Sequence, residues 1–161
     1  MNPALLIIDL QKEFIGHRKD ELIYKQTLEY VNYVSAMFRK AEKNIFIVRD
    51  IEEGNGEEFE NVDELITDGS ETEVLKKFSN SFWKTNLEEL LNKMKIDFLV
   101  LCGNAAEFCV LATYNGAVER GFKAAILQNG VFAASETGLK DLADNRPLIS
   151  YPVVQYILDK S

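Results

Sequence analysis

The sequence predicts a doubly wound α/β fold, with helices on both faces of a mainly parallel sheet. Two observations carry this prediction. Short apolar runs alternate with longer amphipathic stretches along the chain, which is typical of such sheets. In addition, 161 residues with 47% hydrophobic content suit one well-filled core. We therefore expect a single domain over residues 1–161.

The N-terminal part of the chain predicts two strands joined by a long helix. Ala4 to Ile8 is an apolar run too short for a helix, as expected of a central parallel strand buried on both faces, and it ends at Asp9. Between about Asp20 and Lys43, apolar side chains recur at helical spacing among charged ones, which indicates an amphipathic helix. A second short strand is expected at Asn44 to Val48.

The segment from Ile51 to Thr72 is predicted to be a loop. It is rich in Glu, Gly, Asn and Asp and has few apolar anchors, so we expect at most one short helix, around Val62 to Ile66. Long loops on small domains often carry function, although a plain solvated surface is the alternative. We expect this loop to contribute to the rim of a site.

A third strand and its helix follow. The strand is expected at Glu73 to Phe78, and the turn after it at Ser79-Asn80-Ser81. A helix is predicted from about Asn86 to Met94, with Thr85 as its N-cap residue.

The C-terminal part continues the alternation. A strand at Phe98 to Cys102 leads through a turn into a helix that ends at Gly121, and a further strand is expected at Lys123 to Leu127. A helix is predicted at Ala134 to Ala143, entered at Ser135. The last apolar segment, Val153 to Leu158, is expected to be a strand or a sheet edge.

The charge composition limits the classes of partner. The formal net charge is -8 and the sequence pI is about 4.8, with lysines scattered along the chain. No basic stripe for nucleic acid or an anionic membrane is therefore expected. A small molecule or another protein is the favoured partner.

The cysteines and the N-terminus favour a cytoplasmic protein. Two cysteines do not make a disulfide framework in a chain of this length, and both lie in one apolar region, as expected of reduced thiols. The first apolar run is only a few residues long and ends at Asp9, so neither a signal peptide nor a membrane anchor is predicted.

Cys109 is predicted to lie in the first turn of a helix, just after a strand that breaks at Gly103. The N–H groups of a first helical turn have no intrahelical partners, and the helix dipole is positive there. The pKa of this thiol is therefore expected to fall below the ~8.5 of a free cysteine. The same N–H groups could hold an oxyanion. A packing role as a small buried residue is the alternative.

Two further polar residues end predicted strands. Asp9 ends the first strand, and Lys76 or Lys77 lies near the end of the third. Ligands of doubly wound sheets bind at the carboxyl ends of the strands, where Cys109 is also expected. Each residue alone has a structural explanation, as a turn cap or a solvated charge. Together they suit nucleophilic catalysis, because a thiol needs a proton acceptor and a cation favours the thiolate.

A histidine-based site is less favoured. His17 is the one histidine and lies in a polar turn, which is a poor platform for a general base, although a Cys-His dyad stays open. One histidine and two cysteines also lack the ligand spacing of a zinc site. We expect no metal and no cofactor.

Three segments resemble the isochorismatase-like cysteine hydrolase superfamily, in the same order and at similar separations. They are LLIIDLQKEF, KKFSNSFWKTNLEELL and DFLVLCGNAAEFCVLATYNGAVERGFKAAIL. The resemblance covers about Ala4 to Ala134 and implies a three-layer α/β/α fold with a parallel sheet. It also implies a homo-oligomer.

The resemblance assigns roles to the candidate residues. It implies a catalytic triad in which Asp9 is the acid–base group, Cys109 the nucleophile and Lys76 the lysine, with Lys77 as the second choice.

The turn before Cys109 also matches the superfamily. There the resemblance implies a cis peptide bond between Asn104 and Ala105. The N–H groups of Ala105 and Cys109 would then form the oxyanion hole.

Departures from the superfamily pattern limit the predicted function. Nicotinamidases of this superfamily hold a metal with an Asp-x-His segment after the second strand, whereas Asp50 is followed here by Ile51, Glu52 and Glu53. Many relatives carry Thr at the position of Ala106. Retention of the cysteine favours acyl transfer over the vinyl-ether cleavage of isochorismatases proper.

The sequence thus predicts a metal-independent amidohydrolase that cleaves a small amide or carbamoyl compound through a thioester. Phe14, Asn80 and Phe82 are expected to form pocket walls, with core packing as the alternative for the aromatic pair. Two other functions stay open. One is a catalytically idle relative that binds a metabolite or protein partner, and the other is an isochorismate-type vinyl-ether hydrolase.

Overall fold

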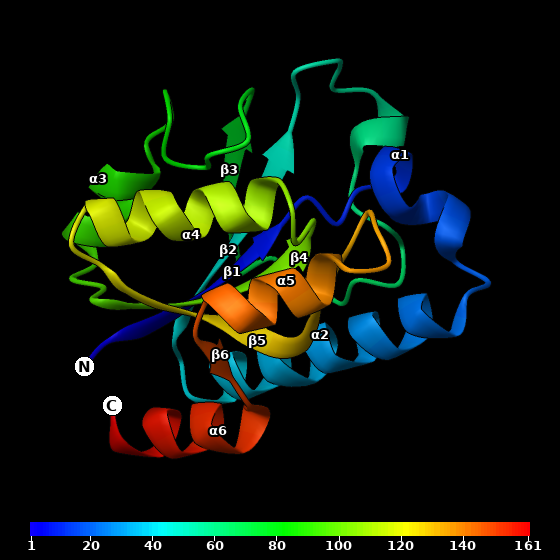
Figure 1. The fold of residues 1–161 in the computed structure, drawn as a ribbon. Helices are drawn as coiled ribbons and strands as arrows, with labels where there is room; N and C mark the ends of the chain where they lie inside the picture. The colour runs from blue at the N-terminus through cyan, green and yellow to red at the C-terminus, as the bar shows by residue number, and fades with distance from the viewer.

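Six strands form one sheet at the centre of the computed structural model, which describes residues 1–161 (Figure 1). The strands are β1 (Pro3–Ile8), β2 (Asn44–Asp50), β3 (Thr72–Lys76), β4 (Phe98–Asn104), β5 (Lys123–Phe132) and β6 (Leu148–Ile149). They lie in the order β3-β2-β1-β4-β5-β6, and every neighbouring pair is parallel. The winding direction reverses between β1 and β4, so the expected ligand site lies beyond the carboxyl ends of these two strands.

Helices cover both faces of the sheet, which confirms the predicted three-layer α/β/α fold (Figure 1). The helices are α1 (Lys12–Ile15), α2 (Leu22–Lys40), α3 (Leu87–Lys93), α4 (Cys109–Glu119), α5 (Gly138–Asn145) and α6 (Tyr151–Lys160). Two single 3-10 turns, η1 (Gly16–Arg18) and η2 (Glu57–Phe59), complete the set. Side chains of α2 and α6 pack on one face, while those of α3, α4 and α5 pack on the other.

The central strand β1 shows why these short apolar runs form strands. Successive side chains of a strand point to opposite faces. Accordingly, Leu5 and Ile7 join the core under α2, whereas Leu6 and Ile8 join the core under α3 and α4. All of them are buried, so a continuous apolar run is needed here in place of an alternating one.

The structure corrects the prediction for the C-terminal segment. Val153 to Leu158 belongs to helix α6 and not to a strand, and the last strand is the short β6 before it. The helix begins at Tyr151 with Pro152 in its first turn, a position that suits proline. Val154 and Leu158, one helical turn apart, are its buried residues, so the helix buries a single apolar stripe.

The loop between β2 and β3 also differs in detail from the prediction. Its helical turn is η2, and no helix forms at Val62 to Ile66. The short helix α1 was not predicted, because four residues are too few to show a helical period. Thr85 lies one residue earlier than a standard N-cap, although its hydroxyl accepts the Leu87 N–H at 3.3 Å.

None of the helices combines the length and the apolar composition needed to cross a membrane.

Candidate active site

Asp9 directly follows Ile8, the last residue of β1, and therefore lies at the carboxyl edge of the sheet. Its backbone is in the left-handed region, with φ of 51°, a conformation that Asp tolerates better than most residues. Its N–H donates to the Val48 carbonyl at 2.9 Å, which ties β1 to β2. The residue is 2% exposed, and its Oδ1 has no hydrogen-bond partner in the chain. A buried carboxylate oxygen thus stays free for a proton or a ligand.

The ammonium group of Lys76, the last residue of β3, lies between two carboxylates and the sulfur of a cysteine. Its Nζ is 2.9 Å from Asp9 Oδ2, 2.6 Å from Asp50 Oδ2 and 3.4 Å from Cys109 Sγ. An ammonium has three N–H donors, so each donor has one partner. Lys77, the second choice for this role, is exposed to solvent.

Asp50 is a site residue that the sequence prediction did not include. It pairs with Lys76 in the β2–β3 register and receives the Lys76 ammonium on Oδ2, while its Oδ1 accepts the Glu52 N–H at 2.9 Å. The buried Gln11 side chain holds it from both sides, because its Oε1 accepts the Asp50 N–H at 2.7 Å and its Nε2 donates to the Asp50 carbonyl at 2.8 Å. Its position at the end of a strand, as at Asp9, was the available signal.

Cys109 is the first residue of α4 and is half-buried. Its Sγ and the nearest carboxylate oxygens of Asp9 and Asp50 all lie within 4.8 Å of one another. We call Asp9, Asp50, Lys76 and Cys109 the site cluster. The structure therefore brings together the three residues predicted for the triad and adds a second carboxylate.

The prediction of a lowered thiol pKa is wrong. Burial and the neighbouring Asp9 carboxylate raise the pKa of Cys109 to about 12, although Lys76 acts in the opposite direction. At neutral pH the resting sulfur therefore carries its proton. The local effect of the helix terminus is outweighed by surroundings that only the tertiary fold creates.

Asp9 and Lys76 have the protonation states that proton transfer from the thiol requires. Burial raises the pKa of Asp9 to about 6, against the lowering effect of Lys76, so the carboxylate is mostly ionised at pH 7. Burial disfavours the Lys76 ammonium, but Asp9, Cys109 and Asp50 together raise its pKa and keep it charged.

The turn between β4 and α4 shapes the floor of the site. Gly103 has φ of 120°, and a Cβ there would lie 2.0 Å from the Ile8 carbonyl oxygen, so only glycine fits. The Asn104-Ala105 peptide bond is cis, as the resemblance implies. The N–H groups of Ala105 and Cys109 donate none of the turn and cap hydrogen bonds within the chain, whereas the Ala106 N–H donates to Phe132 at 2.8 Å.

A cavity of about 200 Å³ opens onto the site cluster. Its lining consists of Asp9, Phe14, Asp50, Glu52, Glu53, Asn104, Ala105, Phe108 and Cys109. Phe14 thus lies where the sequence predicts it, and the loop after β2 contributes the rim through Glu52 and Glu53. The aromatic ring of Phe108, which is 59% exposed, stands at the mouth.

Asn80 and Phe82 do not line this cavity, which corrects their prediction as pocket walls. Phe82 is buried and stacks on Phe122 with ring centroids 5.9 Å apart, so it is a core residue. The Asn80 side chain lies against Gly116 and accepts the Phe82 N–H at 3.0 Å. Aromatic and amide side chains serve walls and cores equally well, and the local sequence does not separate the two uses.

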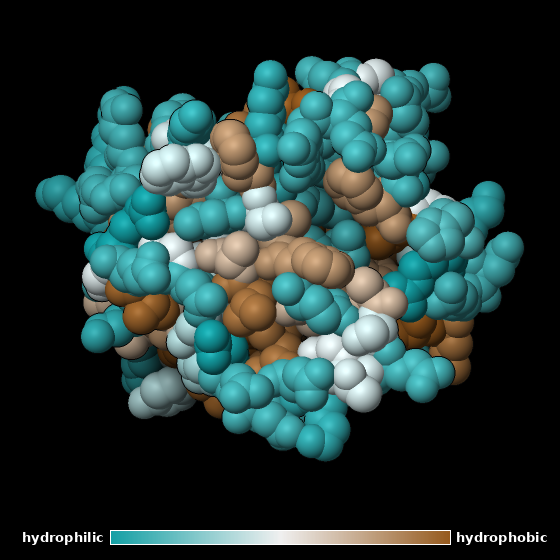
Figure 2. Space-filling view, turned by 45° about the horizontal axis from the view of Figure 1, so that its top comes forward, coloured by the Kyte–Doolittle hydropathy of each residue, from teal (hydrophilic) through white to brown (hydrophobic).

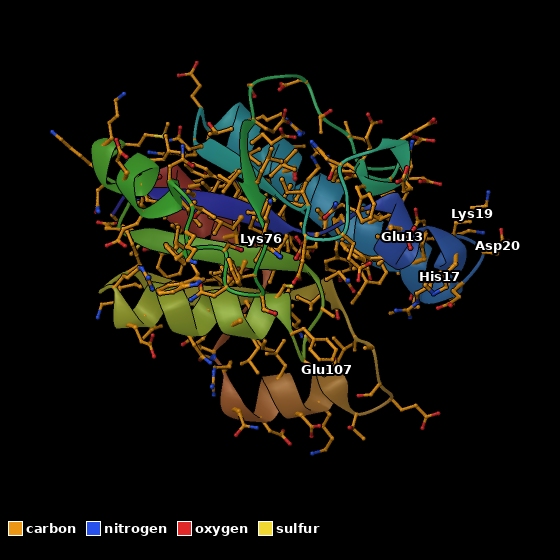
Figure 3. The ribbon with its side chains drawn as sticks, turned by 90° about the horizontal axis from the view of Figure 1, so that it is seen from above. Glu13, His17, Lys19, Asp20, Lys76 and Glu107 are labelled. Carbon is orange, nitrogen blue, oxygen red and sulfur yellow. The ribbon has the colours of Figure 1, made fainter.

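A larger hollow of about 710 Å³ adjoins the cavity and shares four lining residues with it, Phe14, Asn104, Ala105 and Phe108. His17 lines this hollow and not the cavity around Cys109. Figure 3 shows Lys76 over the sheet, with His17 and Glu13 to one side on the segment of α1 and η1. The structure therefore does not form a Cys-His dyad.

The residues present do not fit the metal site of the Asp-x-His type. The acceptors of Asp50 are both engaged, by the Lys76 ammonium and by the Glu52 N–H, and Glu52 stands where that pattern has histidine. Asp9, Asp50 and Cys109 are close enough to ligate an ion, but Lys76 already contacts one oxygen of each carboxylate and the sulfur. An ion would have to displace a buried ammonium.

The fold and the site cluster define a doubly wound α/β protein with an Asp-Lys-Cys arrangement at its switch point. A family model described as "Isochorismatase domain" matches residues 3–146, and the chain belongs to this family of hydrolases. One curated relative, the uncharacterized isochorismatase family protein YddQ of Bacillus subtilis (strain 168), is 28% identical over 141 residues, covering 80% of this chain and 77% of its own length.

Solved structures confirm the fold. N-carbamoylsarcosine amidase from Thermoplasma acidophilum superposes with a TM-score of 0.81 at 22% identity, covering 93% of this chain and 95% of its own. The nicotinamidase SaPncA from Staphylococcus aureus superposes with a TM-score of 0.77 at 20% identity, covering 88% and 89%. At this level of identity the likeness concerns the architecture alone.

Proposed function

We propose that the protein is a metal-independent cysteine amidohydrolase, which cleaves the C–N bond of a small amide or carbamoyl compound. The observation that carries the proposal is the contact of Lys76 with Asp9 and Cys109, at 2.9 Å and 3.4 Å, beside a free Asp9 oxygen and a cavity. A nucleophile, a proton acceptor and a fixed cation are the parts that such a reaction needs.

Acylation begins from the neutral thiol. Because the pKa of Cys109 is about 12 and that of Asp9 is about 6, complete proton transfer before attack is unfavourable. Asp9 therefore takes the proton from Sγ as the sulfur attacks the carbonyl carbon. The S–C bond forms, and the carbonyl oxygen becomes an oxyanion to which the Ala105 and Cys109 N–H groups donate.

The remaining steps return the proton to the products. Asp9 gives its proton to the nitrogen as the C–N bond breaks, which leaves a thioester on Cys109 and releases an amine or ammonia. Asp9 then takes a proton from water as the water attacks the thioester. The C–S bond breaks, the acid leaves, and the thiol regains its proton. Lys76 remains charged throughout and stabilises the negative charge that moves between Asp9 and Sγ.

A substrate panel tests the proposal. Primary amides, carbamoyl compounds and isochorismate would be incubated with the protein, with ammonia or amine release and loss of the vinyl ether as readouts. We expect turnover of an amide or carbamoyl compound that disappears in Cys109→Ser. Cleavage of isochorismate that survives this substitution would instead support the vinyl-ether hydrolase, and no turnover at all would support a binding protein.

Alkylation tests the thiol directly. Iodoacetamide should label Cys109 far faster than Cys102, which is buried in β4. Peptide mass spectrometry over time gives both rates. Equal rates at the two cysteines would contradict the proposal.

Ala106 does not favour the catalytically idle alternative. The residue is 1% exposed and packs in the core on the side of α3 and α4, and it is absent from the cavity lining. The absence of a hydroxyl at this position therefore removes no group from the cavity.

A further inference from the structure

The cavity above Cys109 is negatively charged. Within the site cluster, one cation, Lys76, faces two carboxylates, Asp9 and Asp50, so the three groups carry one net negative charge when ionised. The lining adds Glu52 and Glu53 and contains no Lys, Arg or His. Apart from Lys76, which already pairs with two carboxylates below Cys109, the charged side chains that a ligand meets in this cavity are therefore all carboxylates.

Glu52 and Glu53 are free to act on a ligand. Both residues are exposed at the mouth, and neither takes part in any of the ion pairs of the chain. Their positions depend on a firmly held segment, because Gln11 fixes Asp50 and the Asp50 side chain accepts the Glu52 N–H. The charge at the mouth is thus built into the end of β2.

The adjoining hollow has the same sign. Its lining includes three carboxylates, Glu13, Glu21 and Glu136, against one arginine, Arg18, and one histidine, His17. Arg18 pairs with Glu21 at 3.0 Å and donates to the Ala133 carbonyl at 3.0 Å, so its charge is offset by Glu21, and Glu13 and Glu136 remain as carboxylates without an ion pair. Figure 2, in which the carboxyl end of the sheet is turned forward, shows hydrophilic side chains around the periphery of this face and hydrophobic ones across its middle.

A residue with a buried, unpaired acceptor also belongs to the cavity lining. Asp9 lines it, is 2% exposed and leaves Oδ1 without a donor in the chain. Such an oxygen favours a ligand that brings an N–H group to it. The volume of about 200 Å³ is below the roughly 300–1,000 Å³ of pockets for drug-sized ligands, so the ligand is small.

We propose that the substrate is a small amide or carbamoyl compound that carries a positively charged amino group, and that the cavity rejects compounds carrying a carboxylate. The inference rests on the proposed function for the identity of the scissile bond, and on the charges of the cavity for the rest. The ammonium of the substrate lies at the mouth beside Glu52 and Glu53, while its carbonyl carbon lies over Cys109. The aromatic rings of Phe14 and Phe108 flank the short chain between the two groups.

Three matched amides test this proposal by binding alone. Pentanamide is neutral, 4-aminobutanamide replaces its terminal methyl by an ammonium, and succinamate carries a carboxylate. Calorimetric titration of Cys109→Ser measures their affinities without turnover, and protection of Cys109 from iodoacetamide in the unmodified protein gives a second measure. We expect 4-aminobutanamide to bind about tenfold tighter than pentanamide, and succinamate to bind weakest, with the differences shrinking at high salt.

Paired variants locate the effect. Glu52→Gln with Glu53→Gln should reduce the advantage of 4-aminobutanamide to about threefold or less. Glu89→Gln with Glu119→Gln removes the same charge from exposed positions outside the cavity and should leave it unchanged. The proposal would be overturned if the three amides bound equally, if succinamate bound tightest, or if none of them bound. It would also be overturned if Glu52→Gln with Glu53→Gln left the advantage of 4-aminobutanamide over pentanamide unchanged. Selective binding of the cation without hydrolysis would instead contradict the proposed function and leave the charge preference standing.

Discussion

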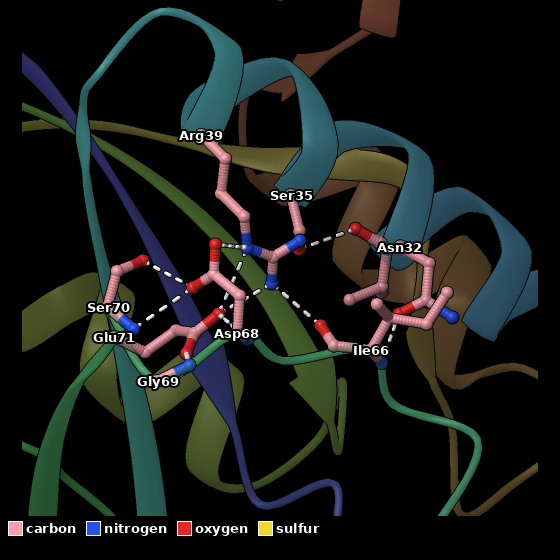
Figure 4. A network of polar contacts seen from close by, with 9 residues as sticks. Asn32, Ser35, Arg39, Ile66, Asp68, Gly69, Ser70 and Glu71 are labelled. Atoms are coloured by element: carbon pink, nitrogen blue, oxygen red, sulfur yellow. Dashed lines mark hydrogen bonds and ion pairs between the residues drawn. The ribbon is translucent and has the colours of Figure 1, made fainter.

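Two ion clusters of this protein share one cation between two carboxylates, but they differ in how completely their hydrogen bonds are satisfied. One is the site cluster around Lys76 at the carboxyl edge of the sheet. The other lies where the end of α2 meets the loop before β3 (Figure 4). We call it the Arg39 cluster, and its members are Asn32, Arg39, Ile66, Asp68 and Glu71.

In the Arg39 cluster both oxygens of the buried carboxylate have donors. Glu71 Oε1 accepts from Arg39 Nη2 at 2.6 Å, and Oε2 accepts the Gly69 N–H at 3.0 Å. Burial alone would raise the pKa of Glu71, but these hydrogen bonds hold it below its usual value. Arg39 also donates to the Ile66 carbonyl at 2.6 Å. The network fixes the approach to β3 and leaves neither oxygen of the buried Glu71 carboxylate without a donor.

In the site cluster one acceptor is left open. Asp9 Oδ1 has no donor, and burial raises the pKa of this carboxyl to about 6. An open acceptor with a raised pKa beside a cavity is what proton transfer needs, whereas a complete network with a lowered pKa stabilises the fold. Both clusters contain a buried ion pair, so the ion pair alone does not distinguish a catalytic cluster from a stabilising one. The difference is that both oxygens of Glu71 have donors, whereas Asp9 Oδ1 has none.

Removing the cation of the site cluster should have the largest effect. Lys76→Met leaves Asp9 and Asp50 facing each other without a counter-charge, so we expect a loss of about 3–5 kcal/mol in the free energy of unfolding at pH 7 and no measurable turnover. Urea unfolding measures this, with Lys77→Met as the matched control. The deficit should shrink at pH 5, because the unpaired carboxylates can then take up protons. A deficit that is independent of pH would argue against charge as its cause.

Removing the open acceptor should affect catalysis far more than stability. Asp9→Asn keeps the shape of the side chain but cannot accept the thiol proton, so kcat/KM should fall by about 10²-fold to 10³-fold. Glu71→Gln, the corresponding change in the Arg39 cluster, should leave kcat/KM within about threefold and lower the melting temperature. Comparable losses of activity in both variants would remove the distinction between the clusters.

Disrupting the Arg39 cluster should lower the free energy of unfolding without changing the catalysed reaction. Arg39→Met removes hydrogen bonds to Glu71 and to the Ile66 carbonyl, and we expect a loss of about 2 kcal/mol in the free energy of unfolding, with little change in kcat/KM. Denaturant unfolding combined with the amide assay measures both quantities. A large fall in kcat/KM of the folded variant would show that the position of β3, and thus of Lys76, depends on this network.

The pH profile should give the smallest effect. Because Asp9 must be ionised to act as a base and its pKa is about 6, kcat/KM should fall about tenfold between neutral pH and pH 5. The signs for stability are opposite in the two clusters. The raised pKa of Asp9 contributes stability at low pH that is lost as the pH rises toward 6, whereas the lowered pKa of Glu71 contributes stability that is lost as the pH falls through it. An acid limb that persists in Asp9→Asn would assign it to another group.

The central strands and the location of the site could be predicted from local sequence. Ala4 to Ile8 is a short apolar run, which forms β1, and Gly103 ends the straight part of β4 because only glycine fits against Ile8. The rule that parallel strands present their carboxyl ends at one edge placed Asp9, Cys109 and either Lys76 or Lys77 near one another, and the family resemblance selected Lys76.

Three features of the site could not be predicted from the sequence, because each depends on contacts between segments that are distant along the chain. Asp50 joins the site because β2 lies between β1 and β3, and strand order is not written in any one strand. The pKa of Cys109 is set by burial and by Asp9, both of which arise only in the folded chain. For the same reason Phe82, which has the composition of a pocket wall, packs in the core against Phe122.

The order of the strands also has a consequence for folding kinetics. The site cluster draws its members from the ends of β1, β2 and β3, which are neighbours in the sheet, and from the start of the helix α4, and these segments are far apart along the chain. Until these strands have paired, Asp9 and Lys76 are hydrated as separate ions, and the sulfur of Cys109 has neither neighbour. Contacts between such distant segments form slowly, because the chain must first close large loops. Because the pKa of Cys109 is raised only in the folded chain, the slowing of its alkylation during refolding would therefore report the last stage of sheet assembly, later than the recovery of helical signal.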